Sequence, residues 1–109
     1  MVAGPYTANA ATAEERVANL GAMNRAAAVV FDRGWTPVIG VNMALPVIAA
    51  AGEARFDDIM APISLSLAAR CDAVLRIGGP STGADAELDL IRKQGGAVYF
   101  QLEDVPPAP

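Results

Sequence analysis

Short runs of strand-forming residues alternate with longer helical segments along this chain, and this alternation constrains the fold more than any other feature. Strands are expected at residues 1–4, 36–41, 73–77 and 97–101, and helices at residues 12–32, 56–70 and 84–94. Strands that alternate with helices form a parallel sheet with right-handed crossover connections. Such sheets bind ligands outside the carboxyl ends of their strands, near a switch in strand order.

Local signals mark the ends of the first helix and the limits of the segment that follows it. Thr12 and Glu15 match a capping box at its start, and Gly34 suits the left-handed position just past its end. Residues 42–55 are rich in alanine and broken by Pro46, so we expect a loop there with one helical turn.

Composition and charge exclude several classes of protein. The net charge is −4 and the eight Lys and Arg residues are scattered, so no nucleic-acid partner is expected. The chain has no His and one Cys, Cys71, which excludes thiolate–imidazole metal sites and Cys–His or Ser–His nucleophile pairs. We therefore expect no metal and no cofactor. The longest apolar run, residues 38–51, is too short to span a bilayer, and the N-terminus lacks the pattern of a signal peptide. These features predict a cytoplasmic protein that binds no membrane.

Length and hydrophobicity predict one small domain that associates with itself. Residues 1–104 form the expected domain, and residues 105–109 form a Pro-rich tail that we expect to be loose. A domain of this size has little core of its own, and 53% of the residues are hydrophobic. A homodimer or a larger homo-oligomer is therefore expected.

Two loops fall at the expected ligand edge of the sheet, residues 4–7 and residues 78–83. The second loop is rich in glycine and opens a helix, so its backbone amides and the helix dipole favour an anion such as phosphate. Ser81 adds a hydroxyl group, and Glu87, one turn into the helix, could project into the same cleft. The alternative interpretation is a loop capped by Thr82 with a solvated Glu87.

Two other residues have two interpretations each. Trp35 could stack on a base, or it could pack against the helix that ends before it. Arg76 interrupts an apolar run, so it either pairs with an acid, Asp72 or Asp85, or points outward at an edge of the sheet.

Three motifs span most of the chain: Ala3-Gly-Pro-Tyr-Thr7, Arg70-Cys-Asp-Ala-Val-Leu75 and Ser81-x-Gly83-x-x-x-Glu87. Together they resemble the nucleoside 2-deoxyribosyltransferase superfamily, which includes deoxynucleoside-monophosphate N-glycosidases. The chain is most similar to the short, uncharacterised bacterial and phage domains of that group. The resemblance implies a three-layer, flavodoxin-like or Rossmann-like α/β domain, and we expect about four parallel strands in the order 2-1-3-4.

The resemblance also implies roles for individual residues. Glu87 would attack the anomeric carbon of the deoxyribose and carry the sugar covalently, with Tyr6 beside the sugar. The substrate, a nucleoside or nucleotide, would be held by the first loop, by the last motif and by two further positions. These expected substrate-binding residues are Gly4, Pro5, Ser81, Gly83, Ser64 and Asn42. Asn42 is included because it follows the strand expected at residues 36–41 and could face the cleft, not because of the resemblance; a turn residue is the equal alternative.

One departure from the family pattern bears on catalysis. Catalytic members carry an aspartate eight residues before the Asp72 position, where it helps to protonate the leaving base, and this chain has Ser64 there. A serine is not a general acid near neutral pH. The resemblance implies an N-glycosidase or deoxyribosyltransferase. Ser64 favours the first of two alternatives, a non-catalytic nucleotide-binding module; the second is a phage or accessory interaction protein.

Overall fold

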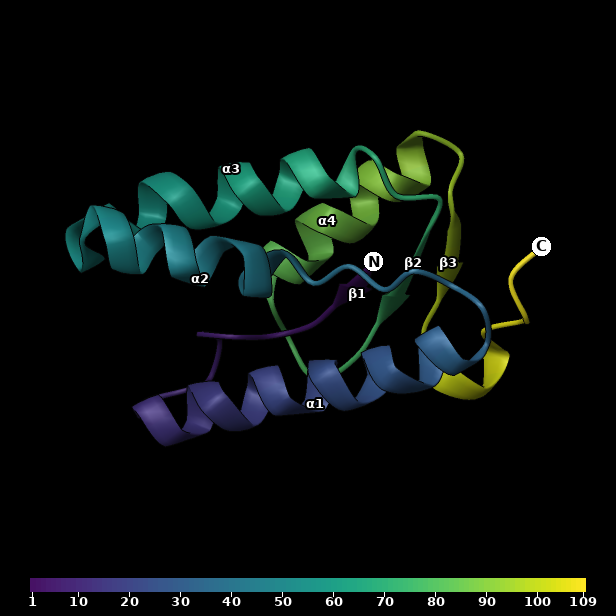
Figure 1. The fold of residues 1–109 in the computed structure, drawn as a ribbon, viewed down its shortest axis with the longest axis horizontal. Coiled ribbons are helices and arrows are strands. Elements are labelled where there is room, and N and C mark those ends of the chain that lie inside the picture. Colours follow the sequence, from purple (N-terminus) through teal and green to yellow (C-terminus); the bar gives the residue numbers. More distant parts are fainter.

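Three short apolar runs form a parallel sheet in the computed structural model, which describes residues 1–109 (Figure 1). The strands lie in chain order, with Val2 opposite Leu75 and Leu75 opposite Tyr99. The elements are β1 (Val2–Ala3), α1 (Ala13–Asp32), α2 (Gly40–Ala51), α3 (Phe56–Ala68), β2 (Ala73–Arg76), α4 (Thr82–Lys93) and β3 (Ala97–Tyr99). Short 3₁₀ turns, Glu53–Arg55 and Leu102–Asp104, precede α3 and follow β3.

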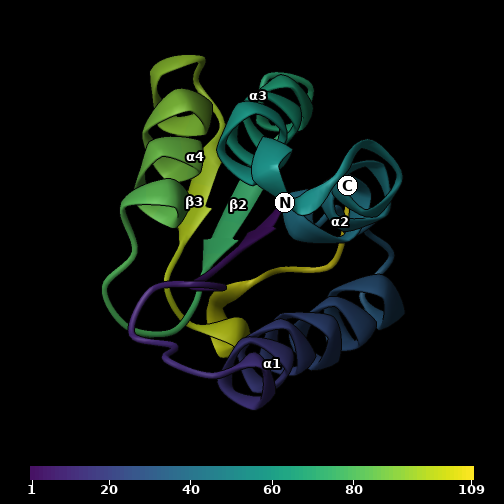
Figure 2. The ribbon, with the colours of Figure 1, turned by 90° about the vertical axis from the view of Figure 1, so that its left-hand side faces the viewer.

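The helices cover the two faces of the sheet unequally. Figure 2 shows α1 on one face, α3 and α4 on the other, and α2 beside α3 past the edge strand β1. Apolar clusters fill the spaces between α1 and the sheet, between α4 and the sheet, and between α2 and α3. No helix combines the length and the apolar character needed to cross a membrane.

The predicted four-stranded sheet of order 2-1-3-4 is wrong, because residues 36–41 do not form a strand. One backbone hydrogen bond, from the Val2 amide to the Val38 carbonyl at 2.8 Å, joins this segment to β1. Pro37 has no amide to donate, and the chain enters α2 at Gly40. Too few residues remain between Pro37 and Gly40 to form a ladder of backbone hydrogen bonds with β1. The sheet therefore has three strands, in the order β1-β2-β3.

The segment after it, predicted as a loop, is the helix α2. Pro46 lies inside this helix, where it costs one hydrogen bond to the carbonyl four residues earlier. Alanine favours the helix, and a stripe spaced by four residues packs on α3: Gly40, Ala44 and Ile48. Burial of that stripe outweighs the proline defect.

The predicted ends of α1 are confirmed. The Thr12 hydroxyl accepts a hydrogen bond from the Glu15 amide at 3.1 Å, as a capping box requires. The Glu15 carboxylate accepts its hydrogen bond from the Ala11 amide at 3.1 Å, one residue before the Thr12 amide that a capping box would use. Gly34 follows the helix with a φ of 93°, the left-handed conformation expected of it.

The C-terminal residues are docked, contrary to the prediction of a loose tail. The Arg33 guanidinium donates to the carbonyls of Leu102 and Val105, and the Val105 side chain is buried against α1. The Trp35 indole donates to the Pro106 carbonyl at 2.7 Å. Trp35 therefore packs at the end of α1 and fastens the tail there.

Candidate functional site

Glu87 is a carboxyl group within the buried stripe of α4. The stripe follows helical spacing and consists of Ala84, Glu87, Leu88 and Ile91. The Ser81 hydroxyl caps the helix by accepting a hydrogen bond from the Ala84 amide at 3.1 Å, so Ser81 and not Thr82 is the N-cap. Glu87 is only 9% exposed, and the alternative of a solvated helix residue is therefore wrong.

The Glu87 carboxyl faces a cavity of about 160 Å³ at the carboxyl end of the sheet. Its walls include six of the eight residues that the sequence singled out: Gly4, Tyr6, Ser64, Ser81, Gly83 and Glu87. They come from the loop after β1, from α3 and from the start of α4. The fold thus brings together residues that are as much as 81 positions apart in the chain, Tyr6 and Glu87.

Two of the predicted substrate-binding residues lie elsewhere. The Asn42 side chain is exposed and donates to the Asn24 side chain at 2.7 Å, which ties α2 to α1. It does not reach the cavity because residues 36–41 do not end as a strand at the carboxyl edge. Pro5 packs instead against Gly78, where a Cβ would lie 2.7 Å from the Pro5 Cδ. Pro5 therefore holds the two loops together and is not part of the cavity wall.

Sequence reasoning missed the apolar residues that line the cavity. The Phe56 ring stacks with the Tyr6 ring at a centroid separation of 6.5 Å and an interplanar angle of 13°. Phe56, Met60 and Ser64 recur every four residues on α3, so they share one face. The four-residue spacing of Phe56 and Met60 from Ser64 was the one sequence signal that could have placed them in the cavity wall. Apolar residues at this spacing are equally typical of a helix face buried in the core. The other apolar wall residues are Ala8, Val41, Ala61, Leu65, Ala84 and Ala86.

Burial raises the pKa of Glu87 from 4.5 to about 7, while the positive charges of the Met1 ammonium and Arg76 act in the opposite direction. No protein group donates a hydrogen bond to this carboxyl, although every fully enclosed polar side-chain atom has a partner. The Glu87 carboxyl oxygens are therefore not fully enclosed, in agreement with the place of Glu87 in the cavity wall. Near neutral pH the group can serve as an acid, a base or a nucleophile, depending on its protonation.

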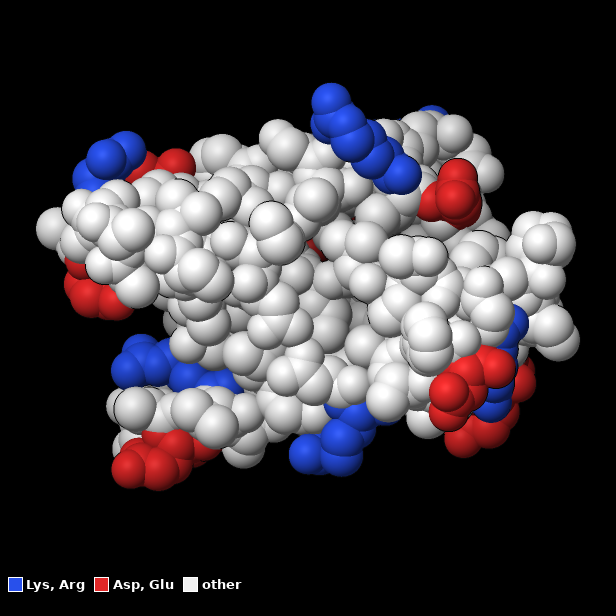
Figure 3. Space-filling model, viewed as in Figure 1, with Lys and Arg blue, Asp and Glu red and all other residues white.

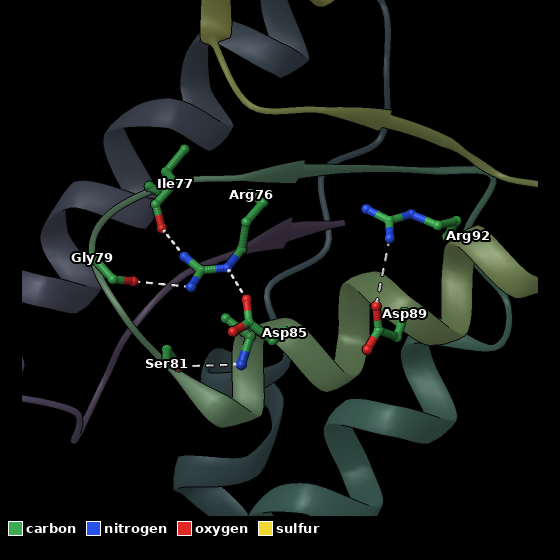
Figure 4. Close-up of polar contacts among 8 residues, drawn as sticks. Arg76, Ile77, Gly79, Ser81, Asp85, Asp89 and Arg92 are labelled. Atoms are coloured by element: carbon green, nitrogen blue, oxygen red, sulfur yellow. Dashed lines mark hydrogen bonds and ion pairs between the residues drawn. The ribbon is translucent and has the colours of Figure 1, made fainter.

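Arg76 anchors the glycine-rich loop beside the cavity (Figure 4). Its Nε donates to the Asp85 carboxylate at 3.0 Å, which identifies Asp85 and not Asp72 as its acidic partner. The rest of the guanidinium bonds to the carbonyls of Ile77 and Gly79.

A larger cavity, of about 400 Å³, opens at the amino ends of the strands. Trp35, Tyr99 and Cys71 are among its wall residues, and the Cys71 thiol donates to the Leu67 carbonyl at 3.2 Å. No buried ionisable side chain faces this cavity. A more open hollow of about 740 Å³ is lined by Arg76 and the glycine-rich loop, but the Arg76 guanidinium is already paired with Asp85 and the loop carbonyls. The cavity that Glu87 lines is therefore the candidate site.

No group of three or more Cys, Asp or Glu side chains is placed to hold a metal ion. Comparison with protein-family models, with curated proteins and with solved structures gave no match. The site must therefore be interpreted from its own geometry and chemistry.

Proposed function

We propose that the protein cleaves the N-glycosidic bond of a deoxynucleoside or its 5′-monophosphate, with Glu87 as the nucleophile. The observation that carries this proposal is the buried Glu87 carboxyl, which has no partner in the protein and faces a cavity shared with Tyr6 and Ser81. The resemblance of the three sequence motifs to the nucleoside 2-deoxyribosyltransferase superfamily supports the same role.

The chemistry begins with attack of the Glu87 carboxylate on the anomeric carbon. The carbon–nitrogen bond breaks, the base leaves with the bonding electrons and takes up a proton, and an ester joins the sugar to Glu87. Water then displaces the sugar in a hydrolase, or a second base does so in a transferase, and the carboxylate is regenerated. A carboxylate held away from water is well suited to this step because positive charge develops on the sugar beside it.

The start of α4 offers a place for the remainder of the substrate. The amides of Thr82 and Gly83 lie in the first turn of α4, where no carbonyl of the helix is available to accept their hydrogen bonds. The space beside Gly83 is open, because a Cβ there would meet no atom within 4 Å. These amides and the Ser81 hydroxyl could hold a 5′-phosphate or a sugar hydroxyl. At about 160 Å³ the cavity is smaller than most ligand pockets, at roughly 300–1,000 Å³, so part of the substrate would remain outside it.

A second function, binding of a nucleotide without catalysis, is favoured by one observation. Glu87 is the only carboxyl group in the cavity wall, and Ser64 lies where a proton donor would be expected. Without such a donor the leaving base must obtain its proton from water.

We place this activity in a cytoplasmic homodimer. The side chains of Met43 and Val47, four residues apart on α2, are 56% and 44% exposed. No charged residue occurs from Gly34 to Gly52, and Figure 3 shows a broad uncharged surface over this part of the molecule. Exposed apolar surface of this kind favours contact between subunits.

The test is to incubate the protein with a panel of deoxynucleosides and their 5′-monophosphates and to measure the free base by chromatography. Release of base that is lost in Glu87→Gln supports the enzyme. If no base is released but a deoxynucleotide raises the melting temperature, the binding module is the correct function. If neither occurs with any member of the panel, both proposals fail.

A further inference from the structure

Arg76 occupies a buried position at the carboxyl end of β2 and is 9% exposed. Its side chain lies on the face of the sheet that α4 covers, as its contact with Asp85 shows. A buried guanidinium is costly unless its charge and its donors are matched. The contacts of the Arg76 guanidinium therefore indicate which interactions compensate for its burial.

One planar group joins three parts of the chain (Figure 4). The Arg76 guanidinium donates to the Asp85 carboxylate at 3.0 Å, to the Ile77 carbonyl at 2.5 Å and to the Gly79 carbonyl at 2.9 Å. Asp85 lies in the first turn of α4, Ile77 directly follows β2, and Gly79 lies in the glycine-rich loop between the two elements. A lysine ammonium, a single point on a flexible stem, cannot reproduce this fork.

The loop needs such an anchor because its own backbone is permissive. Gly78 has a φ of 77°, and a Cβ on Gly79 would meet nothing within 4 Å. Glycine at these positions allows many conformations in the absence of outside contacts. The same loop leads directly to Ser81, and α4 carries Glu87 one turn later.

We propose, on the basis of the function proposed above, that Arg76 is the positioning residue of the Glu87 site. Its guanidinium fastens residues 77–80 and the first turn of α4 to β2, so that Ser81 and Glu87 keep their orientation toward the cavity. Its charge also sets the electrostatic surroundings of the Glu87 carboxyl.

Few charged groups lie around Glu87. The Met1 ammonium lies just before β1, and Arg76 is the last residue of β2. Both positive charges lower the pKa of Glu87 against the larger effect of burial. Asp85 pairs with Arg76 from α4 itself, whereas α3 and the first loop bring no charged side chain to the cavity. Their polar or titratable side chains there are those of Ser64, Tyr6 and Thr7. Loss of the Arg76 charge should therefore raise the pKa of Glu87, and loss of the Asp85 charge should lower it.

The first arm of the test follows the titration of the Glu87 carboxyl carbon by NMR, which requires no activity. We expect the midpoint in Arg76→Gln to rise by about 0.5 pH unit or more, and the midpoint in Asp85→Asn to fall. Arg92→Gln is the matched control, because Arg92 lies 3.9 Å from Asp89 on the same helix and both side chains are exposed. An unchanged midpoint in both test variants, or an equal shift in the control, overturns the electrostatic role of Arg76.

The second arm separates position from charge with Arg76→Lys. This variant should keep the wild-type midpoint but exchange the amides of residues 78–84 faster, because the three contacts cannot all be made. Calorimetry with the four common deoxynucleoside 5′-monophosphates identifies the one that the wild type binds most tightly, and its binding to Arg76→Lys should be weaker by about tenfold or more. Wild-type amide exchange in Arg76→Lys overturns the positioning role. If the wild-type protein itself binds no deoxynucleotide, the proposed function fails, and the titration and exchange data still decide the role of Arg76.

Discussion

The backbone of Gly40 packs directly against the side chain of Ser64: a Cβ on Gly40 would lie 2.8 Å from the Ser64 Cβ and closer still to its Oγ. This contact holds the start of α2 against the face of α3 that borders the cavity. Only glycine leaves room for it, because real Cβ atoms do not approach other carbons so closely.

Gly40→Ala should therefore lower the free energy of unfolding by about 1–3 kcal/mol, the usual cost of an overpacked core. Urea unfolding followed by circular dichroism measures this. Gly83→Ala is the matched control, because a Cβ there would meet nothing within 4 Å, and it should leave stability unchanged or raise it by about 0.5–1 kcal/mol. If Gly40→Ala is as stable as the wild type, the contact between α2 and α3 has been placed wrongly.

The buried Glu87 should make stability depend on pH. Its pKa rises from 4.5 to about 7 on folding, so the folded state holds a proton that the unfolded state loses between these values. Its contribution to stability is fully present below pH 4.5 and is lost as the pH rises through about 7. The shift corresponds to about 3 kcal/mol at most.

Glu87→Gln isolates this contribution because the amide stays neutral. Relative to the wild type, the variant should gain free energy of unfolding between pH 4.5 and about pH 7 and show a constant difference above that range. Urea unfolding of both proteins at pH 5 and pH 8 measures the two differences. Equal differences at the two pH values would show that Glu87 is ionised throughout and hence not desolvated.

The sequence predicted the elements that rest on local signals. Thr12, Glu15 and Gly34 mark the ends of α1 through their own side chain or backbone conformation, and the apolar run around Val74 is recognisable without its neighbours. The segment from Thr36 to Ala51 was predicted incorrectly because its structure depends on distant contacts. Its β-branched residues favour a strand and its alanines carry no periodic signal, but packing on α3 makes most of it a helix.

The site residues that could be predicted from the sequence are those whose side chains carry distinctive chemistry. A carboxyl group in an apolar helical stripe and a tyrosine after a glycine–proline pair are recognisable in the sequence, and the fold brings Glu87 and Tyr6 into one cavity. Asn42 was misplaced because its assignment depended on a strand that does not exist. Phe56 and Met60 were missed because an apolar wall residue of a cavity has the same chemistry as a core residue.

Subunit association should depend on the exposed apolar face of α2. Met43→Glu combined with Val47→Lys places charges on both exposed side chains without touching the buried stripe of that helix. We expect the wild type to be a dimer at tens of micromolar, roughly the range for weak pairing, and the double variant to be a monomer. Light scattering measures both masses. A wild-type monomer, or a double variant that remains dimeric, contradicts this interface.

The last prediction concerns the proton that the leaving base requires. Ser64 lines the cavity beside Glu87 but cannot supply this proton near neutral pH. If its absence limits the reaction, the wild type should be slow on ordinary deoxynucleosides and faster on substrates whose leaving group needs no proton. Ser64→Asp should then raise the rate on ordinary substrates, by up to the ~10²–10⁴-fold that general acid catalysis commonly supplies.

The control must distinguish proton donation from a change in packing, because Ser64 is buried against Gly40. Ser64→Asn has nearly the shape of the aspartate variant and cannot donate an acidic proton, so it should not raise the rate. The advantage of Ser64→Asp should also disappear on a substrate with a leaving group that needs no proton, since the donor acts only on the base. Initial rates for the three proteins on both kinds of substrate provide the comparison. An equal gain in Ser64→Asn would attribute the effect to the shape of the cavity, and another group would then have to protonate the base.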